Sequence, residues 1–211
     1  MNRGFVIAIA GYKGSGKSVV ARTLLHEHIA IHRGNAVVLK LAQPLKDMLR
    51  AIGLGYNELE GHAKEAPCTI LCGRTPRHAM QTLGTEWRNM IHPHLFVRIW
   101  RQRAAELVGA SYLVICDDLR FQHELEMIRE FPSSVWFVER PGYSAADTRK
   151  KRWWQSYWRK AATIHPSEAN YSFLKEAANE VIINDNSVDV LKNYTIAKYN
   201  NIMPLRKTLV E

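Results

Sequence analysis

Short runs of hydrophobic residues recur along the chain, and longer segments separate them. The runs are rich in β-branched and aromatic residues and are bounded by glycine or polar residues, which is typical of strands buried in a sheet. The predicted strands span Phe5–Ala10, Ala36–Ala42, Ser111–Cys116, Val135–Glu139 and Val181–Asn184.

The segments between these runs are predicted to be mainly helical. Pro44 is compatible with the first turn of a short helix. Residues 53–75 are less regular and receive no element. The predicted helices span Lys17–His32, Pro44–Ile52, Pro76–Ile91, His94–Val108, Phe121–Phe131 and Pro166–Ala178, with a last helix beginning near Val188.

The alternation of strands and helices defines the expected fold. It predicts an α/β protein with a parallel five-stranded sheet covered by helices on both faces. Ligands of such sheets bind at the carboxyl ends of the strands. We therefore expect the functional residues to follow the strands.

Composition places the chain among globular proteins with a hydrophobic core. Its 211 residues are 46% hydrophobic and 23% charged, which fits one domain. The sequence contains no run of about 20 apolar residues, the length that a membrane-spanning helix needs. The apolar part of MNRGFVIAIAG is too short for a signal peptide. The three cysteines favour a reducing compartment, so we expect a cytoplasmic protein, in the host cytoplasm if viral.

The net charge of +9 indicates an anionic partner. Nucleotides and nucleic acid both fit. Much of the charge lies in TRKKRWWQSYWRK, Thr148 to Lys160. This segment is open to three interpretations: a closing lid, aromatic packing against the body, or a nucleic-acid surface with basic residues on phosphates and aromatics on bases.

The strongest motif is GYKGSGKS, Gly11 to Ser18, between the first strand and the first helix. A G-x-x-x-x-G-K-S loop in that context cradles nucleotide phosphates with backbone N–H groups and the helix N-terminus. Lys17 is expected to reach the β/γ-phosphates and Ser18 to bind Mg²⁺. Lys13 is either a solvated loop lysine or a further phosphate ligand. The ATP ligands expected here are Gly11, Lys13, Gly14, Ser15, Gly16, Lys17 and Ser18.

A second motif, CDDLRF, ends the third strand. An acidic residue at the end of an apolar strand beside a phosphate loop usually holds Mg²⁺. Asp117 comes first and is our candidate metal ligand, and Asp118 follows directly. The alternative for one of these two residues, Asp117 or Asp118, is a role only as the N-cap of the next helix. Arg120 is either a bidentate clamp on a phosphate or a surface arginine. Lys17, Asp117 and Arg120 are the predicted catalytic residues.

The segment Thr75–Ile91 combines a polar stripe with a hydrophobic arc. At 3.6 residues per turn, Arg77, Gln81 and Arg88 fall within roughly 40° of one another. Arginine suits a phosphate and glutamine a base edge, although a solvated polar face has the same periodicity. The arc expected to face the core contains Met80, Leu83, Trp87, Met90 and Ile91.

Several motifs together resemble one enzyme family. GYKGSGKS, AQPLKDML, GRTPRHAMQTLGTEW, CDDLRF, VERPG and HPSE occur in this order. The pattern is similar to that of the bacteriophage deoxynucleoside monophosphate kinases, within the P-loop nucleoside monophosphate kinase superfamily. The resemblance extends from the first strand to VIINDN.

The resemblance implies transfer of the γ-phosphate of ATP, with Mg²⁺, to a deoxynucleoside monophosphate. It implies one P-loop kinase domain, 1–211, with an acceptor-binding insert at 53–110 and a lid at 141–166. Arg77, Gln81 and Arg88 would face the acceptor, with Arg120 near its phosphate. In the lid, Arg149, Arg152 and Arg159 are the candidates to contact ATP. Asn184 would lie where related kinases contact adenine, although a simple turn also fits.

The sequence departs from the family at two places. Relatives often carry aspartate at the position of Gln43, and they tend to have Gly-Arg after the tryptophan where Arg88 follows Trp87 directly. A phosphate monoester is already ionised near neutral pH, with a second pKa of about 6, so its phosphorylation needs no carboxylate base. Glutamine at position 43 therefore fits a monophosphate acceptor better than a hydroxyl acceptor.

Two rival functions remain: another small-molecule P-loop kinase of the dephospho-coenzyme A type, and a nucleic-acid-bound P-loop ATPase that uses the basic segment. Either a monomer or a homodimer is compatible with the sequence. His62, Cys68, Cys72 and His78 have an unusual spacing for a zinc site. Nucleic acid is a secondary candidate as a partner, after ATP and a monophosphate.

Overall fold

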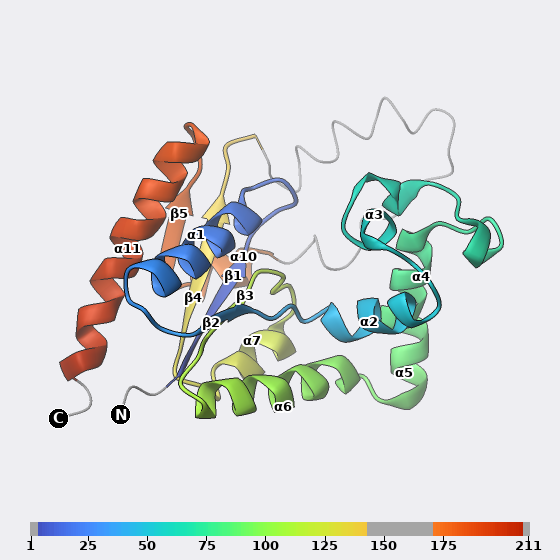
Figure 1. Cartoon of the computed structure of the whole chain (residues 1–211), viewed down its shortest axis with the longest axis horizontal. Helices are drawn as coiled ribbons and strands as arrows, with labels where there is room; N and C mark the ends of the chain where they lie inside the picture. The colour runs from blue at the N-terminus through green and yellow to red at the C-terminus, as the bar shows by residue number, and fades with distance from the viewer. Residues whose placement is uncertain (1–3, 143–170, 209–211) are drawn as a thin grey trace. The chain divides into compact units, whose positions relative to one another are not determined.

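The computed structural model describes residues 4–142 and 171–208, and the side chains up to residue 202. Its strands form one sheet in the order β2-β3-β1-β4-β5, and every neighbouring pair is parallel (Figure 1). The α/β fold with a five-stranded parallel sheet is therefore confirmed. The strands are β1 Phe5–Ala10, β2 Ala36–Val38, β3 Leu113–Cys116, β4 Ser133–Glu139 and β5 Glu180–Ile183.

Helices fill most of the connections between these strands, and short 3-10 and π turns occur between β2 and β3. None of the described helices is long and apolar enough to cross a membrane. The helical elements are α1 Lys17–Ala30, α2 Gln43–Ala51, α3 Tyr56–Leu59, η1 His62–Glu65, η2 Thr69–Leu71, α4 Pro76–Thr82, η3 Leu83–Trp87, α5 Arg88–Ile91, α6 Leu95–Gly109, α7 Gln122–Ile128, α10 Tyr171–Glu176 and α11 Val188–Thr208.

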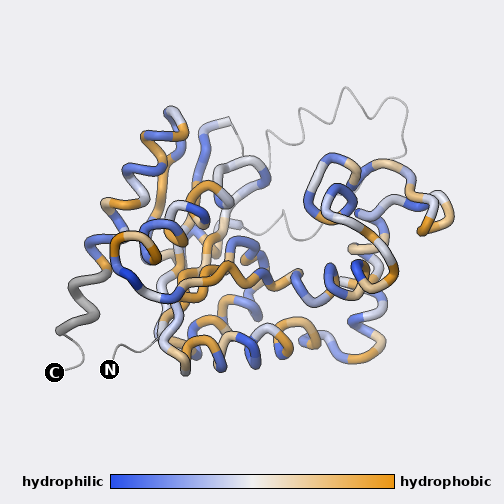
Figure 2. Tube along the Cα trace, viewed as in Figure 1, coloured by the Kyte–Doolittle hydropathy of each residue, from blue (hydrophilic) through white to orange (hydrophobic). Residues whose placement is uncertain are grey.

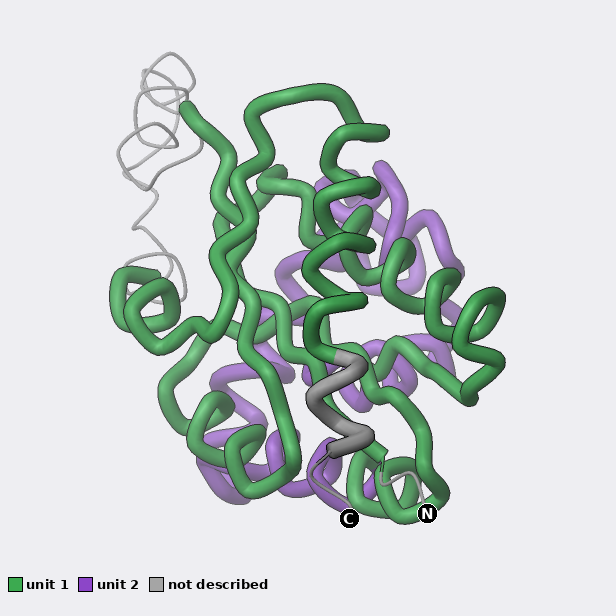
Figure 3. Tube along the Cα trace, turned by 90° about the vertical axis from the view of Figure 1, so that its left-hand side faces the viewer, with its two compact units in different colours: residues 1–39, 104–211 green, residues 40–103 purple. Residues whose placement is uncertain are grey.

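The chain divides into two compact units, coloured separately in Figure 3. Unit 1 contains residues 1–39 and 104–211 and includes the whole sheet. Unit 2 contains residues 40–103 and is helical. Most of the segment 53–110, for which we predict acceptor binding, belongs to unit 2.

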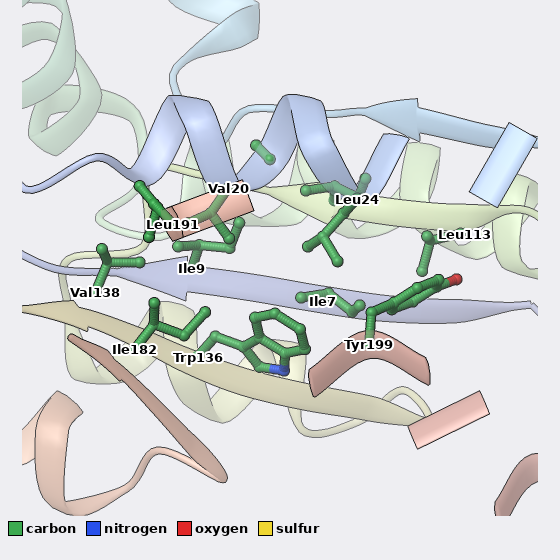
Figure 4. Packing of buried hydrophobic residues seen from close by; sticks show 12 residues of the cluster. Ile7, Ile9, Val20, Leu24, Leu113, Trp136, Val138, Ile182, Leu191 and Tyr199 are labelled. Carbon is green, nitrogen blue, oxygen red and sulfur yellow. The ribbon is translucent and has the colours of Figure 1, made fainter. Parts of the chain in front are cut away.

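Unit 1 is organised around a hydrophobic layer on one face of the sheet. Ile7 and Ile9 of β1 and Trp136 of β4 are fully buried there, against Leu24 of α1 and Tyr199 of α11 (Figure 4). Hydrophobic residues, orange in Figure 2, follow the strands of unit 1, whereas α11 alternates hydrophobic and polar positions. The continuous hydrophobic runs therefore predicted buried strands correctly for β1, β3 and β4, whereas β2 and β5 are only partly buried.

The opposite face of the sheet carries a second helical layer. Helix α10 contacts both β1 and α7. Its residues Tyr171 and Leu174 are buried, and the Tyr171 ring packs edge-on against Tyr12, with ring centroids 4.8 Å apart. Successive side chains of a strand point to opposite faces of the sheet. The same five strands can therefore pack against both helical layers.

The second strand is shorter than predicted. We expected Ala36–Ala42, but β2 ends at Val38. Among the described strands it is an edge strand that pairs with β3 alone, and one further backbone bond, from Leu39 N–H to Ile115 O at 2.8 Å, follows it. Gln43 and Pro44 then begin α2, so the hydrophobic run continues into a turn rather than along the sheet.

The predicted helix Pro76–Ile91 is wrong as one regular α-helix. It consists of α4, the π-helical turn η3 and α5. A π turn is wider than 3.6 residues, so it changes the direction of every side chain that follows. Met80 and Leu83 pack on the unit 2 cluster of Leu49, Leu54 and Leu59 as expected.

Beyond the π turn, residues of the hydrophobic arc that we expected to face the core are exposed. Met90 is 85% exposed and Ile91 is 54% exposed. Trp87, the last residue of η3, is partly buried and lies 6.2 Å from Phe96, measured between ring centroids. The core-facing prediction is therefore wrong for Met90 and Ile91.

Candidate active site

The phosphate loop has backbone conformations that favour glycine. Gly11, Gly14 and Gly16 have φ angles of 139°, 83° and 107°. A Cβ atom on Gly11 would lie 2.3 Å from Val138 O, and one on Gly16 would lie 2.8 Å from Asn184 Nδ2. The loop thus packs against the ends of β4 and β5 at distances that leave no room for a side chain.

Side chains from outside the loop hold its backbone. Asn184, directly after β5, donates from Nδ2 to Ser15 O at 2.8 Å. Arg140, directly after β4, donates from Nη1 to Gly14 O at 3.3 Å. Asn184 is thus more than a turn residue, since its amide fixes the loop; its contact with adenine stays a prediction.

The two lysines of the loop differ in their surroundings. Lys17 is partly buried, and its ammonium donates to Gly11 O at 2.5 Å and to Tyr12 O at 2.8 Å. Lys13 is exposed. Lys17 therefore lies along the inner backbone of the loop, whereas Lys13 projects from it.

Ser18 and Asp117 meet at the carboxyl ends of two neighbouring strands. The Ser18 hydroxyl donates to Asp117 Oδ2 at 3.2 Å, although the two residues are 99 positions apart in sequence. They meet because β1, which precedes the loop, pairs directly with β3, which precedes Asp117. A hydroxyl and a carboxylate at this distance are an oxygen donor set that fits Mg²⁺.

The residues after Asp117 form a turn that leads into α7, and the N-cap of this helix differs from our expectation. The N-cap of α7 is Phe121, not Asp117 or Asp118, so the alternative N-cap role is wrong. Glu124 supplies the cap, because its Oε2 accepts N–H bonds from Arg120 at 2.8 Å and Phe121 at 2.9 Å. Asp118 Oδ1 instead accepts from Cys116 Sγ at 3.5 Å. The Arg120 side chain is exposed.

Glu124 is a buried carboxyl group, 8% exposed, directly beneath this turn. Burial raises its pKa to about 7, although the N–H groups of Arg120 and Phe121 act in the opposite direction. The folded protein therefore binds this proton more tightly than the unfolded chain. The resulting stabilisation is fully present below the unfolded pKa of 4.5 and is lost as pH rises through 7.

We predict that Glu124→Gln removes this pH dependence. The glutamine carbonyl oxygen can accept the same N–H bonds but does not titrate. Between pH 5 and pH 8, the free energy of unfolding of the wild type should fall by roughly 2.5 kcal/mol relative to the variant. Urea unfolding of both proteins at pH 5 and pH 8 measures this difference in the free energy of unfolding. Glu126→Gln, which changes an exposed carboxyl group of the same helix, is the control. Parallel pH profiles for wild type and Glu124→Gln would contradict the assignment.

Three of the four predicted acceptor residues, Arg77, Gln81 and Arg88, lie in unit 2, whereas Arg120 belongs to unit 1. Arg77 on α4 forms an ion pair from Nε to Glu65 Oε1 on η1. Arg88 on α5 donates from Nε and Nη2 to Asn89 Oδ1 at 3.1 and 3.0 Å. The side chain of Gln81 is exposed. Because η3 lies between Gln81 and Arg88, the 3.6-residue spacing that aligned Arg88 with Arg77 and Gln81 does not hold.

Sequence reasoning missed a second group of charges in unit 2. Lys46 of α2 is 7% exposed and donates to Glu60 Oε1 at 2.6 Å. Lys40 and Lys64 each approach Glu60 Oε2 to 3.8 Å. The available signal was the lysine within AQPLKDML, a motif that we used only for the resemblance.

Some predicted residues lie outside the described part of the chain. Arg149 and Arg152, the basic segment Thr148–Lys160 and the HPSE motif fall within residues 143–170. The greater part of the predicted lid, 141–166, falls there too. These assignments stay predictions.

Unit 2 also contains a surface pocket of about 320 Å³. Arg77, Gln81 and Arg88 do not line it; its walls are Glu58, Ala63, Ala66, Pro67, Cys68, Thr69 and Ile70. Within residues 4–142 and 171–208, no three His, Cys, Asp or Glu side chains lie close enough together to hold a metal ion. His62, Cys68, Cys72 and His78 therefore do not converge.

The chain has an α/β P-loop fold, which solved structures share. The chain is similar to the structure of the Mycobacterium tuberculosis APS kinase CysC in complex with AMPPNP and APS, with 15% identity, a TM-score of 0.53, and coverage of 93% of this chain and 98% of that chain. It is also similar to the dephospho-CoA kinase from Campylobacter jejuni, at 12% identity, a TM-score of 0.49, and coverage of 94% and 97%. No family model matches the sequence.

A curated relative agrees with the resemblance found in the motifs. The chain is 26% identical over 210 residues to a "Putative deoxynucleotide monophosphate kinase" from Acanthamoeba polyphaga mimivirus, which covers 93% of this chain and 96% of the relative. The resemblance to nucleoside monophosphate kinases is thus confirmed. This relative comes from a virus of an amoeba, so a bacteriophage origin stays a prediction.

Proposed function

We propose that the protein transfers the γ-phosphate of ATP to a deoxynucleoside monophosphate and forms the diphosphate. The observation that carries this proposal is the similarity to the mimivirus relative along nearly the whole of both chains. The phosphate loop and the Ser18–Asp117 pair support a nucleotide donor. The proposal that the acceptor is a deoxynucleoside monophosphate rests on the name of this relative and on the motif that contains Arg77, Gln81 and Arg88.

The donor would be held by unit 1. The N–H groups of residues 11–18 would cradle the β- and γ-phosphates, and Lys17 would exchange its carbonyl partners for phosphate oxygens. Ser18 and Asp117 would hold Mg²⁺, which neutralises phosphate charge when it is bound. Asn184 and Arg140 keep the loop in the required shape by bonding to its carbonyl groups.

The acceptor would be recognised by charge and by base edge. Arg77, Arg88 and Arg120 would contact its phosphate or sugar side, and Gln81 its base. No general base is required, since the attacking phosphate oxygen is already ionised near neutral pH. Gln43 fits this chemistry, because glutamine cannot act as a base and none is needed. Its Nε2 donates to Asp47 Oδ1 at 2.7 Å within α2.

Water must be kept from the transferred phosphoryl group, and we assign that task to the lid at 141–166. Arg149 and Arg152 would contribute positive charge when it closes. As a kinase acting on free nucleotides, the protein would work in the cytoplasm, or in the host cytoplasm if viral.

A coupled ADP-release assay with each of the four deoxynucleoside monophosphates tests the proposal. We expect at least one of them to stimulate ADP release strongly over ATP alone. No stimulation by any monophosphate would refute the proposed acceptor. Stimulation by dephospho-coenzyme A, or by single-stranded DNA, would instead favour one of the two rival functions.

Arg77→Ala should raise the Michaelis constant for the acceptor about 10–100-fold, because a charge-assisted bond to phosphate is lost. The Michaelis constant for ATP should change less than about threefold. Steady-state kinetics with each substrate varied in turn measures both values. Arg129→Ala, which removes an exposed arginine that contacts Ala177 O, is the control. An unchanged Michaelis constant for the acceptor in Arg77→Ala would exclude a role of Arg77 in binding the acceptor.

A further inference from the structure

Unit 2 gathers more positive than negative charge at one place. Glu60 Oε1 lies 2.6 Å from Lys46 Nζ, and Glu60 Oε2 lies 3.8 Å from both Lys40 Nζ and Lys64 Nζ. The neighbouring Arg77 pairs with Glu65. Four cationic groups and two carboxylates leave a surplus of two positive charges, and we call this set the Glu60 cluster.

The cluster is partly withdrawn from water. The side chains of Lys46, Lys64 and Lys40 are 9%, 25% and 27% exposed, and that of Glu60 is 19% exposed. Burial lowers the pKa of Lys64, Glu60 opposes this change, and the charges of Lys46, Arg77 and Lys40 lower the pKa further. The lysines therefore repel one another in a medium that screens charge less than bulk water does.

A purely structural ion pair would not require all of these lysines. The close bond between Lys46 and Glu60 is enough to tie α2 to the segment after α3. Lys64, at 3.8 Å, lies beyond hydrogen-bond distance of the carboxylate yet adds a repelling charge. Like charges held together in a partly buried cluster are a feature of sites that bind anions.

We propose that Lys64 and Arg77 bind the phosphate monoester of the acceptor nucleotide, and that Glu60, anchored by Lys46, positions Lys64. A phosphate dianion offers several acceptor oxygens, which suit both an ammonium group and the planar fork of a guanidinium. It would also neutralise the surplus charge of the cluster. This inference rests on the proposed function, because it specifies where the acceptor phosphate lies.

Lys64→Met tests the inference, since methionine keeps an unbranched side chain but lacks the terminal ammonium group and its charge. We expect the Michaelis constant for the deoxynucleoside monophosphate to rise about tenfold or more, and that for ATP to change less than threefold. The inhibition constant of the corresponding deoxynucleoside, which lacks phosphate, should stay unchanged. This difference separates a phosphate contact from a general disturbance of unit 2.

The matched control is Lys192→Met. Lys192 is an exposed lysine of α11 that pairs with Asp189 at 2.9 Å, so its loss removes the same charge from unit 1. It should leave both Michaelis constants within about twofold of the wild type. An unchanged acceptor constant in Lys64→Met, or an equal rise for ATP and acceptor, would overturn the inference.

A binding measurement separates failure of this inference from failure of the proposed function. In the Lys17→Met protein, in which the phosphate loop lacks its lysine, inorganic phosphate should still bind, and Lys17→Met/Lys64→Met should bind it about tenfold more weakly. Titration calorimetry with inorganic phosphate needs no turnover. Equal binding by both proteins, or none by Lys17→Met, would overturn the subsite even if every monophosphate is phosphorylated. Should no monophosphate stimulate ADP release, the titration still decides the subsite.

Discussion

Lys17→Met should lower kcat in the ADP-release assay about 10²–10³-fold, the usual effect of removing one group that stabilises charge developing in the transition state. The ammonium of Lys17 already lies along the inner backbone of the phosphate loop, bonded to Gly11 O and Tyr12 O. An ATP bound in the loop would bring its phosphates to the same place. Methionine occupies a similar volume without the charge, so the loop should keep its conformation.

Lys13→Met provides the matched control for this prediction. Lys13 belongs to the same loop and carries the same charge, but its side chain is exposed. We expect kcat to fall less than about threefold. Similar losses in Lys13→Met and Lys17→Met would show that the loop needs positive charge in general rather than one positioned ammonium group.

The parts of the fold that the sequence predicted well are those decided by local chemistry. β1 was placed at both ends, because its hydrophobic run is followed at once by glycines that cannot continue a strand. Ser18 and Asp117 were both selected as metal ligands from their motifs. Their 3.2 Å separation was not predictable, since it depends on β1 pairing with β3, and hydrophobic runs alone do not give the order of strands in a parallel sheet.

The segment Thr75–Ile91 shows where periodicity fails. Its start was predictable: Thr75 caps α4 by accepting the N–H of His78 at 3.1 Å, and Pro76 occupies the first turn. The π-helical turn η3 was not, because no residue within LGTEW forbids an ordinary α-helix. One wide turn was enough to expose Met90 and Ile91 and to move Arg88 out of register.

Glu60 and Glu124 show a different limit. A single carboxylate in a sequence usually lies in solvent, so the sequence alone predicts no role for either residue. Glu60 acquires its significance from lysines 14 and 20 positions earlier and 4 positions later, and Glu124 from backbone N–H groups at its own helix N-terminus. Such groups are recognised only after folding has assembled their partners.

Asp117→Asn should be the most damaging change among the acidic residues. Asparagine keeps the shape of the side chain and one oxygen but loses the charge that attracts Mg²⁺. We expect kcat to fall about 10²–10³-fold and the Mg²⁺ concentration for half-maximal activity to rise about 10–100-fold. Asp117 is 6% exposed and bonded to Ser18, so Ser18→Ala should raise the Mg²⁺ requirement as well.

Asp118→Asn distinguishes this role from a general need for negative charge after β3. Asp118 is the next residue, but its Oδ1 accepts from Cys116 Sγ rather than from the phosphate-loop serine. Its replacement should leave the Mg²⁺ dependence within about threefold of the wild type. A Mg²⁺ titration of ADP release compares the two variants directly. If Asp118→Asn raises the Mg²⁺ requirement and Asp117→Asn does not, the metal ligand is Asp118, and the Ser18–Asp117 bond serves only to hold the start of α1 to the end of β3.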